Sequence, residues 1–519
     1  MAAGGRGPDI DVAIGGAAGG VATASARGGV GGRGTAAAIG GDMRFRSGVL
    51  LLSMVLAACG ADGGYGGGGG TGATVGGVKD MHLARELIAR GQIPPPAALL
   101  VEGMFAEHDL GLAGAACLDT LCLRAAAGVA PDRDDVSRGW IQIGLSSNVD
   151  PAIYRRPATT FIYTVDVSGS MGWGGGEATP GELARQVLHE LADHIDAGDK
   201  AAIVTYGSSV SVPLGFGSDR GRLHAAIDRL SEGGVTDMES GVRRALDLGR
   251  EARGRGEQVR IVLFTDVQPN VGATSPSAFE QLVAGGADEG VAITVLGLGL
   301  GMGPEIMQSM AHVRGANAFG IITAADVDTF VADEYPWFVA PIAYDLSVGL
   351  ALPAGLDVAT PYGFPTGFAD EPTLTATSVF LSKRRGALLV SIAGDATALE
   401  GLDADLALTW TTPAGFAKST ALHVTRGGAQ VDARGQWFQQ HATQRTTALA
   451  LLVDGMHEAA EQYPFSRAEA EAIMAAAQAR FEADATASGA EDLIPEVDLG
   501  RVMLALIRAG APQGTRYGP

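Results

Sequence analysis

Between residues 158 and 337, long apolar runs alternate with stretches in which apolar residues recur every three or four positions. The runs, among them FIYTVDV and VRIVLFTDV, have the length of strands, and the stretches between them have the period of amphipathic helices. Strands that are apolar along their whole length are buried on both faces, as in a parallel sheet covered by helices. The pattern predicts a doubly wound, mostly parallel α/β sheet.

The residues on either side of this region have other periods. Short segments that alternate between apolar and polar positions occur at 136–157 and 338–428, which predicts an antiparallel β-sandwich. Because these segments flank the α/β region, we expect the α/β domain to be inserted into the sandwich. Helical patterns predict an N-terminal helical region at 79–135 and a C-terminal helical region at 429–512.

The start of the chain is dominated by glycine and alanine. Residues 1–42 have little to bury, so we expect them to be disordered or an artefact upstream of the true initiator, Met43. Residues 43–59 contain two arginines, an apolar run too short to span a bilayer, and small residues before Cys59. This order resembles a bacterial lipoprotein signal, which implies lipidation of Cys59; the alternative is a buried apolar segment with a chance cysteine. Residues 60–78 predict a Gly-rich linker, so the chain is expected to be an exported bacterial lipoprotein of the cell envelope.

Charge and cysteine content narrow the range of partners. The chain has 58 acidic against 37 basic residues, a formal charge of −21, which argues against a nucleic-acid partner. Besides Cys59, the cysteines are Cys117 and Cys122. In an exported protein this close pair favours a disulfide, although two buried thiols are the alternative.

Candidate chemistry begins where the first apolar strand of the α/β region ends. Asp166, Ser168 and Ser170 follow one another at alternate positions in DVSGS. A hydrolase elbow would need a glycine two residues before its serine, and a haloacid-dehalogenase-type phosphatase would need an acid in place of Ser168. Carboxylate and hydroxyl oxygens instead suit a hard divalent cation, which requires further oxygens from other loops.

Two such oxygens follow later strands and loops. Thr236 lies in the glycine-flanked loop EGGVTD, and Asp266 ends the strand VRIVLFTDV. Together with the first three residues they resemble the metal-ion-dependent adhesion site (MIDAS) of von Willebrand factor type A (vWA) domains. The resemblance implies a Rossmann-like vWA sheet that binds Mg²⁺, or Mn²⁺ or Ca²⁺, through Asp166, Ser168, Ser170, Thr236 and Asp266. The alternative is an empty, degenerate site on the same fold, and Val267 stands where family members often have glycine.

Over residues 80–510 the order of segments more loosely resembles bacterial YfbK-like exported vWA lipoproteins. The two resemblances imply a membrane-anchored recognition module whose MIDAS binds a protein partner that presents Asp or Glu. The alternative function is a lipid-tethered structural or assembly factor with no functional metal. No general base accompanies a nucleophile in the motifs, so we expect no enzymatic activity.

Overall fold

The computed structural model describes residues 71–174, 176–365 and 373–514. The upstream segment 1–42, the lipoprotein signal 43–59 and Cys59 lie outside these ranges, so their predictions stay predictions. None of the helices within the described ranges combines the length and the apolar character that crossing a bilayer requires.

The α/β domain is built on a seven-stranded sheet in the order β2-β10-β9-β8-β5-β6-β7. Neighbouring strands run parallel except β7, which pairs antiparallel with β6. The strands in chain order are β2 (Gly77–Val78), β5 (Thr159–Asp166), β6 (Lys200–Tyr206), β7 (Ser211–Gly217), β8 (Gln258–Thr265), β9 (Val291–Leu298) and β10 (Asn317–Ile321). The predicted mostly parallel sheet is thus confirmed.

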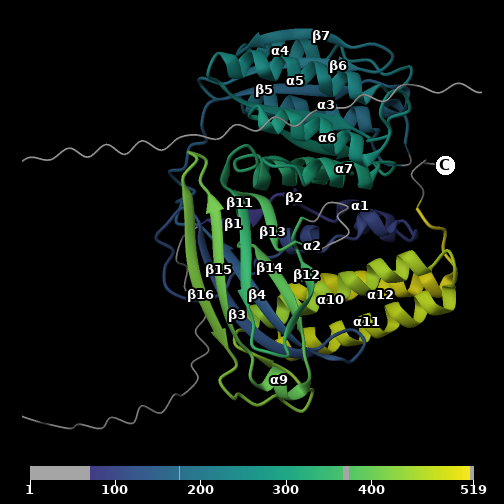
Figure 1. The fold of residues 1–519 in the computed structure, drawn as a ribbon. Coiled ribbons are helices and arrows are strands. Elements are labelled where there is room, and N and C mark those ends of the chain that lie inside the picture. Colours follow the sequence, from purple (N-terminus) through teal and green to yellow (C-terminus); the bar gives the residue numbers. More distant parts are fainter. Residues whose placement is uncertain (1–70, 175, 366–372, 515–519) are drawn as a thin grey trace, which may run out of the picture. The chain divides into compact units, whose positions relative to one another are not determined.

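Helices cover both faces of this sheet (Figure 1). In β8, Ile261 and Leu263 pack against one layer of helices while Val262 and Phe264 pack against the other, which explains why the strand is apolar throughout. One layer contains α5 (Met238–Gly254), α6 (Pro276–Asp288) and α7 (Pro304–Ala311); the other contains α3 (Pro180–Asp193), α4 (Arg220–Ile227) and α8 (Ala324–Thr329).

A second, antiparallel sheet of ten strands has two halves that are joined by the single pair Gly72↔Ser146. One half contains β3 (Cys122–Pro131), β4 (Ser137–Ser146), β12 (Asp357–Tyr362), β14 (Ala387–Ala393) and β17 (Trp437–Phe438). The other contains β1 (Gly72–Val75), β11 (Pro341–Ala351), β13 (Thr375–Ser382), β15 (Asp403–Thr411) and β16 (Ala417–Thr425). Side chains from both halves, such as Ile141 and Leu406, meet in one hydrophobic core, as in a sandwich.

The α/β domain lies within the sequence of this antiparallel sheet. Strand β4 precedes the domain in the chain and β14 follows it, and the two pair directly, with Trp140 opposite Ser391. This pairing agrees with the expected insertion of the α/β domain into the sandwich.

The N-terminal boundaries differ from the prediction. Residues 60–78 were expected to form a linker, yet β1 pairs with β13 and β2 pairs with β10. The chain thereby passes from one sheet into the other within three residues, and Gly77 adopts a φ of +91° at the crossing. Ala73 and Val75 are buried because β1 pairs with β13 at 375–382. This partner strand comes some 300 residues later in the chain, so the local sequence gave no sign of it.

The N-terminal region is also less helical than predicted. Three short helices occur in 79–135, namely α1 (His82–Ala89), η1 (Pro96–Ala98) and α2 (Val101–Glu107), but the region ends in strand β3 of the antiparallel sheet. Between strands, the chain also forms η2 (Gly169–Gly172), η3 (Phe330–Glu334) and α9 (Ala396–Glu400). The C-terminal helices are present as expected: α10 (His441–Gln462), α11 (Arg467–Ser488), η4 (Glu491–Leu493) and α12 (Ile494–Ala509), with α11 packed on both α10 and α12 (Figure 1).

Candidate metal centre

Three of the predicted ligands lie in the loop that follows β5. Asp166 is the last residue of the strand and is only 1% exposed. Its Oδ1 accepts a 2.8 Å hydrogen bond from the backbone N–H of Ser168, and the hydroxyls of Ser168 and Ser170 lie 3.1 Å apart. The turn therefore places one carboxylate and two hydroxyls side by side, and Ser170 is the least buried of the three.

The loop that carries Thr236 is joined to this first loop by backbone hydrogen bonds. Gly169 donates to the carbonyl of Gly234 at 3.1 Å, and Gly233 donates to the carbonyl of Val167 at 2.8 Å. Thr236 itself is 1% exposed. Its hydroxyl takes part in no hydrogen bond with the residues that the structure describes, which leaves the oxygen available to a cation.

Asp266 follows β8, the strand next to β5 in the sheet. Its Oδ1 accepts a 3.2 Å hydrogen bond from the N–H of Gln268, and Asp266 lines the same cavity as Ser170. Asp166, Ser168 and Ser170 are thus linked by hydrogen bonds, and Asp266 shares the lining of one cavity with Ser170.

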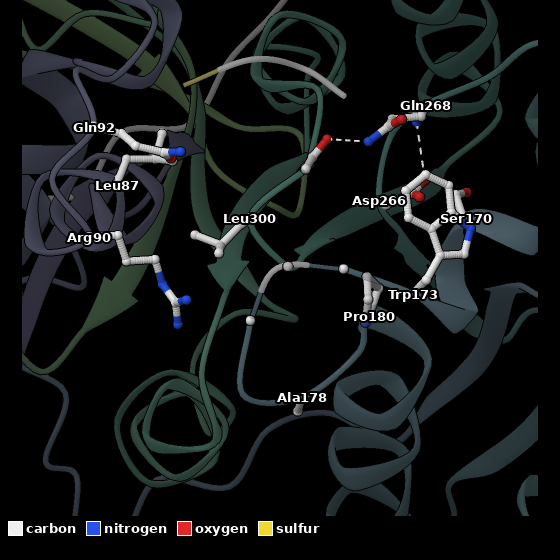
Figure 2. A pocket seen from close by; sticks show the side chains of 14 residues that line it. Leu87, Arg90, Gln92, Ser170, Trp173, Ala178, Pro180, Asp266, Gln268 and Leu300 are labelled. Carbon is white, nitrogen blue, oxygen red and sulfur yellow. Dashed lines mark hydrogen bonds between the residues drawn. The ribbon is translucent and has the colours of Figure 1, made fainter. Parts of the chain in front are cut away.

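Two cavities meet at Ser170. One has a volume of about 560 Å³ and is lined by Ser170, Thr236 and Asn270. The other, of about 390 Å³, has Ser170 and Asp266 on one wall and Leu87 of α1, with Arg90 and Gln92 just after this helix, on the opposite wall (Figure 2). The structure therefore brings all five predicted ligands to one edge of the sheet, at the carboxyl ends of β5 and β8, with Ser170 at the opening.

Further polar residues support the predicted ligands. Thr265 donates its hydroxyl to Oδ2 of Asp166 at 3.1 Å, and the Asn270 Oδ1 accepts the N–H of Thr236 at 3.0 Å. Thr265 belongs to the Thr-Asp pair that ends the strand and so had a sequence signal, whereas nothing in the sequence pattern distinguished Asn270 from an ordinary loop residue.

The electrostatics of the site favour a cation. Burial raises the pKa of Asp166 above its ordinary value. Burial and the nearby Asp166 carboxylate raise the pKa of Asp266 to about 7. Neither acid takes part in an ion pair with any described residue, so a bound cation would offset charge that the protein leaves uncompensated.

The donor set fits a hard cation rather than zinc. No cluster of three or more His, Cys, Asp or Glu side chains suited to a metal occurs among residues 71–174, 176–365 and 373–514. A metal here would depend on the hydroxyls of Ser168, Ser170 and Thr236 as well as the two carboxylates, which is oxygen chemistry typical of Mg²⁺, Mn²⁺ or Ca²⁺.

Val267 keeps the backbone conformation that glycine favours. Its φ is +55°, in the left-handed region, and its side chain is 2% exposed. A β-branched residue is strained in this region, so Val267 holds a conformation that glycine would adopt at lower cost.

Away from this site, the structure contains a disulfide between Cys117 and Cys122, just before and at the start of β3. The disulfide indicates an extracytoplasmic location.

Comparison with known proteins places this site in a family. The model of the von Willebrand factor type A domain matches residues 161–268. The chain is 30% identical over 193 residues to the uncharacterized protein YfbK of Escherichia coli K12. That match spans 37% of this chain and only 33% of YfbK.

Two solved structures are similar to larger parts of the chain, both at 14% identity. The ArnB paralog VWA2 from Sulfolobus acidocaldarius matches 75% of this chain and 98% of its own, with a TM-score of 0.42. A von Willebrand factor type A protein from Catenulispora acidiphila matches 74% of this chain and 91% of its own, with a TM-score of 0.41. From the family match and the relative, this chain is a vWA-domain protein related to YfbK.

Proposed function

We propose that this protein is a recognition module whose vWA domain binds a protein partner through a divalent cation. vWA domains are generally protein-interaction modules. The observation that carries the proposal is the grouping of Asp166, Ser168 and Ser170 in one hydrogen-bonded turn, with Asp266 beside Ser170 in the wall of one cavity. The proposal assigns no catalysis to these residues.

The proposed ligands are Asp166, Ser168, Ser170, Thr236 and Asp266, and the proposed cation is Mg²⁺, with Mn²⁺ or Ca²⁺ as substitutes. When bound, the cation would supply an open coordination position for an Asp or Glu carboxylate of the partner. The protein's own contribution is to hold the donors in place: Thr265 orients the Asp166 carboxylate, and the Thr236 loop is fixed by Asn270.

The surface around the site suits a protein partner. Three large apolar side chains are exposed on the loops that carry the predicted ligands: Trp173 at 58%, Val235 at 44% and Val271 at 41%. Exposed apolar side chains grouped around a polar centre are typical of protein interfaces, and tryptophan is enriched at their strongest contacts.

We further propose that the protein is an exported bacterial lipoprotein of the cell envelope, anchored through Cys59. The Cys117–Cys122 disulfide supports an oxidising compartment. The expected anchor would place the recognition domain near a membrane without a transmembrane helix.

A structural or assembly factor that uses no metal is the second candidate. It is favoured by the hydrogen bond that Thr265 donates to Asp166 and by the backbone hydrogen bonds between the Ser168 and Thr236 loops, since these would hold the loops together without a cation.

Calorimetric titration with Mg²⁺ and Mn²⁺ separates the two candidates. The proposal expects saturable binding to the wild type, loss of binding in Asp166→Ala, and wild-type binding in the control Asp247→Ala, which alters an exposed acid on α5. Capture of an envelope protein that is lost with EDTA and in Asp166→Ala would then identify the partner. Equal metal binding by the wild type and Asp166→Ala would contradict the proposal.

A further inference from the structure

A further cleft, separate from the two cavities at Ser170, lies at the end of the vWA strands opposite the metal centre. It has a volume of about 620 Å³. Arg260 near the start of β8 and Ala292 near the start of β9 line it from the vWA side, whereas Tyr344, Trp410 and Lys418 line it from the antiparallel sheet. The predicted metal residues lie at the opposite edge of the same sheet, at the carboxyl ends of β5 and β8, so the two sites are separate.

Basic side chains dominate the lining of this cleft. Five of the lining residues carry a positive charge and one is acidic, although the whole chain has 58 acidic against 37 basic residues. The basic ones are Arg155, Arg253, Arg260, Arg314 and Lys418, and the acid is Asp119. The cleft is therefore a local concentration of positive charge on an acidic protein.

Most of this charge has no counter-ion among the residues that the structure describes. Arg314 pairs with Asp345, and Lys418 lies 3.7 Å from Asp119. None of the ion pairs among the described residues includes Arg155, Arg253 or Arg260. Within the described part of the chain, the hydrogen bonds of the Arg155 and Arg253 guanidinium groups all go to backbone carbonyls.

Arg260 is the least expected of these residues because it is buried. Its side chain is 1% exposed, and its guanidinium donates to the backbone carbonyls of Ile293, Gly315 and Val339 at 2.8–3.1 Å. Its Nε is buried and has no hydrogen-bond partner among the described residues. Burial lowers the pKa of Arg260 to about 10. A buried cation without an anion is costly, and an anion in the cleft beside it would lower that cost.

The dimensions of the cleft suit a small ligand. Its volume falls within the range of about 300–1,000 Å³ that is typical of small-molecule sites. The Arg253 guanidinium lies against Gly290, which has no side chain, on the vWA side, and the aromatic rings of Tyr344 and Trp410 form part of the other wall. Arg314 already stacks on Tyr344, 3.9 Å from the ring centre, which holds one cation at the wall.

We propose that this cleft binds a small polyanion, a molecule with at least two carboxylate or phosphate charges, between the vWA domain and the antiparallel sheet. Its charged groups are recognised by Arg155 and Arg253 in the cleft, while the buried Arg260 adds positive potential from beneath. Charge-assisted hydrogen bonds to arginine are strong and often bidentate, and they suit both kinds of anionic group.

The test uses the full chain, titrated calorimetrically with tripolyphosphate and with citrate in a metal-free buffer, and with glycerol as a neutral comparison. We expect both anions to bind and glycerol not to bind. Arg155→Gln and Arg253→Gln should each weaken binding about tenfold, as expected for loss of one charge-assisted contact. Both residues are exposed, so these variants should fold.

Two further variants sharpen the result. Ala292→Phe should block the cleft and abolish binding, whereas Arg244→Gln, an exposed arginine without an ion pair on the same helix as Arg253, should leave binding unchanged. Asp166→Ala should also retain binding, which separates this site from the proposed metal centre. Equal losses in Arg244→Gln and Arg253→Gln, unchanged binding in Ala292→Phe, or binding only of an acidic polypeptide such as polyglutamate would overturn the proposal.

Discussion

The hydroxyl of Thr265 donates a 3.1 Å hydrogen bond to Oδ2 of Asp166, from the end of β8 to the end of the neighbouring β5. The same hydroxyl accepts the N–H of Val267 at 2.9 Å. Thr265 therefore fixes the orientation of one predicted ligand and the start of the loop that carries another, without being a predicted ligand itself.

We expect Thr265→Val to weaken metal binding about 10–100-fold while the fold is kept, because the Asp166 carboxylate loses the donor that orients it. Titration with Mn²⁺ measures the effect. Thr164→Val is the matched control: Thr164 is buried on β5, and its hydroxyl contacts only the carbonyl of Ile162, at 3.4 Å. Equal affinities in Thr265→Val and the wild type would show that this hydrogen bond does not position the metal site.

Val267 offers a test of strain next to the site. Because its φ of +55° is unfavourable for a β-branched residue, replacement by glycine relieves strain while it removes buried apolar surface. Val262, a buried valine in the regular part of β8, provides the comparison. We expect both Val267→Gly and Val262→Gly to lower the free energy of unfolding, and the loss in Val267→Gly to be smaller by about 1–2 kcal/mol. Urea denaturation of both variants measures the difference, and equal losses would mean that the left-handed conformation stores no strain.

Features that depend on short stretches of sequence, namely the strands, the helices and the residues of the metal motif, could be predicted from the sequence. Strands such as β8 are apolar because both faces are covered, and the five metal residues follow strands and loops of that same sheet, so periodicity and motif spacing located them together. The antiparallel sheet and the C-terminal helices were visible for the same reason.

The features that the sequence did not show depend on distant partners. Strands β1 and β2 lie in a Gly-rich stretch that reads as a linker, and they are strands only because β13 and β10 provide edges some 240 to 300 residues later. Arg260 lies in an apolar strand whose pattern gave no reason to expect a buried cation, since the carbonyls of Gly315 and Val339 that receive it come from other loops.

His82 joins the N-terminal helix α1 to the vWA domain. Its Nδ1 lies 2.9 Å from the carbonyl oxygen of Gly320 and 3.4 Å from Oδ1 of Asp326. Burial opposes its charge, but the carboxylates of Asp80 and Asp326 outweigh burial and raise the pKa of His82 to about 9.

A raised histidine pKa stabilises the fold only while the ring is protonated. The contribution is complete below the unfolded pKa of about 6.5 and is lost as the pH rises through about 9. We expect the free energy of unfolding to fall between about pH 6.5 and pH 9. In His82→Gln the fall should be smaller, because the contribution of the His82 ring is missing. Urea denaturation across the interval measures it, with His423→Gln, at an exposed histidine of β16, as the control. An unchanged pH slope in His82→Gln would contradict the assignment.

Glu496 joins the two ends of the described chain. Its carboxylate, 3% exposed on α12, accepts two 2.9 Å hydrogen bonds from Arg85 of α1 and lies 3.1 Å from Nε2 of His108. Burial alone would raise the pKa of Glu496, but the hydrogen bond from His108 and the charge of Arg85 hold it below its usual range.

We expect Glu496→Ala to lower the free energy of unfolding by about 2–4 kcal/mol, because Arg85 and the buried His108 lose a partner that water does not replace. The loss stays below that of an isolated buried pair, since Arg85 keeps its contact with Glu107. Glu471→Ala removes an exposed acid that pairs with Arg508 of the same helix α12 and should cost less than about 1 kcal/mol. Urea denaturation of both variants measures the contrast. Similar losses in the two would mean that the N-terminal helix is held to α12 by the apolar core to which both helices contribute rather than by this charge network.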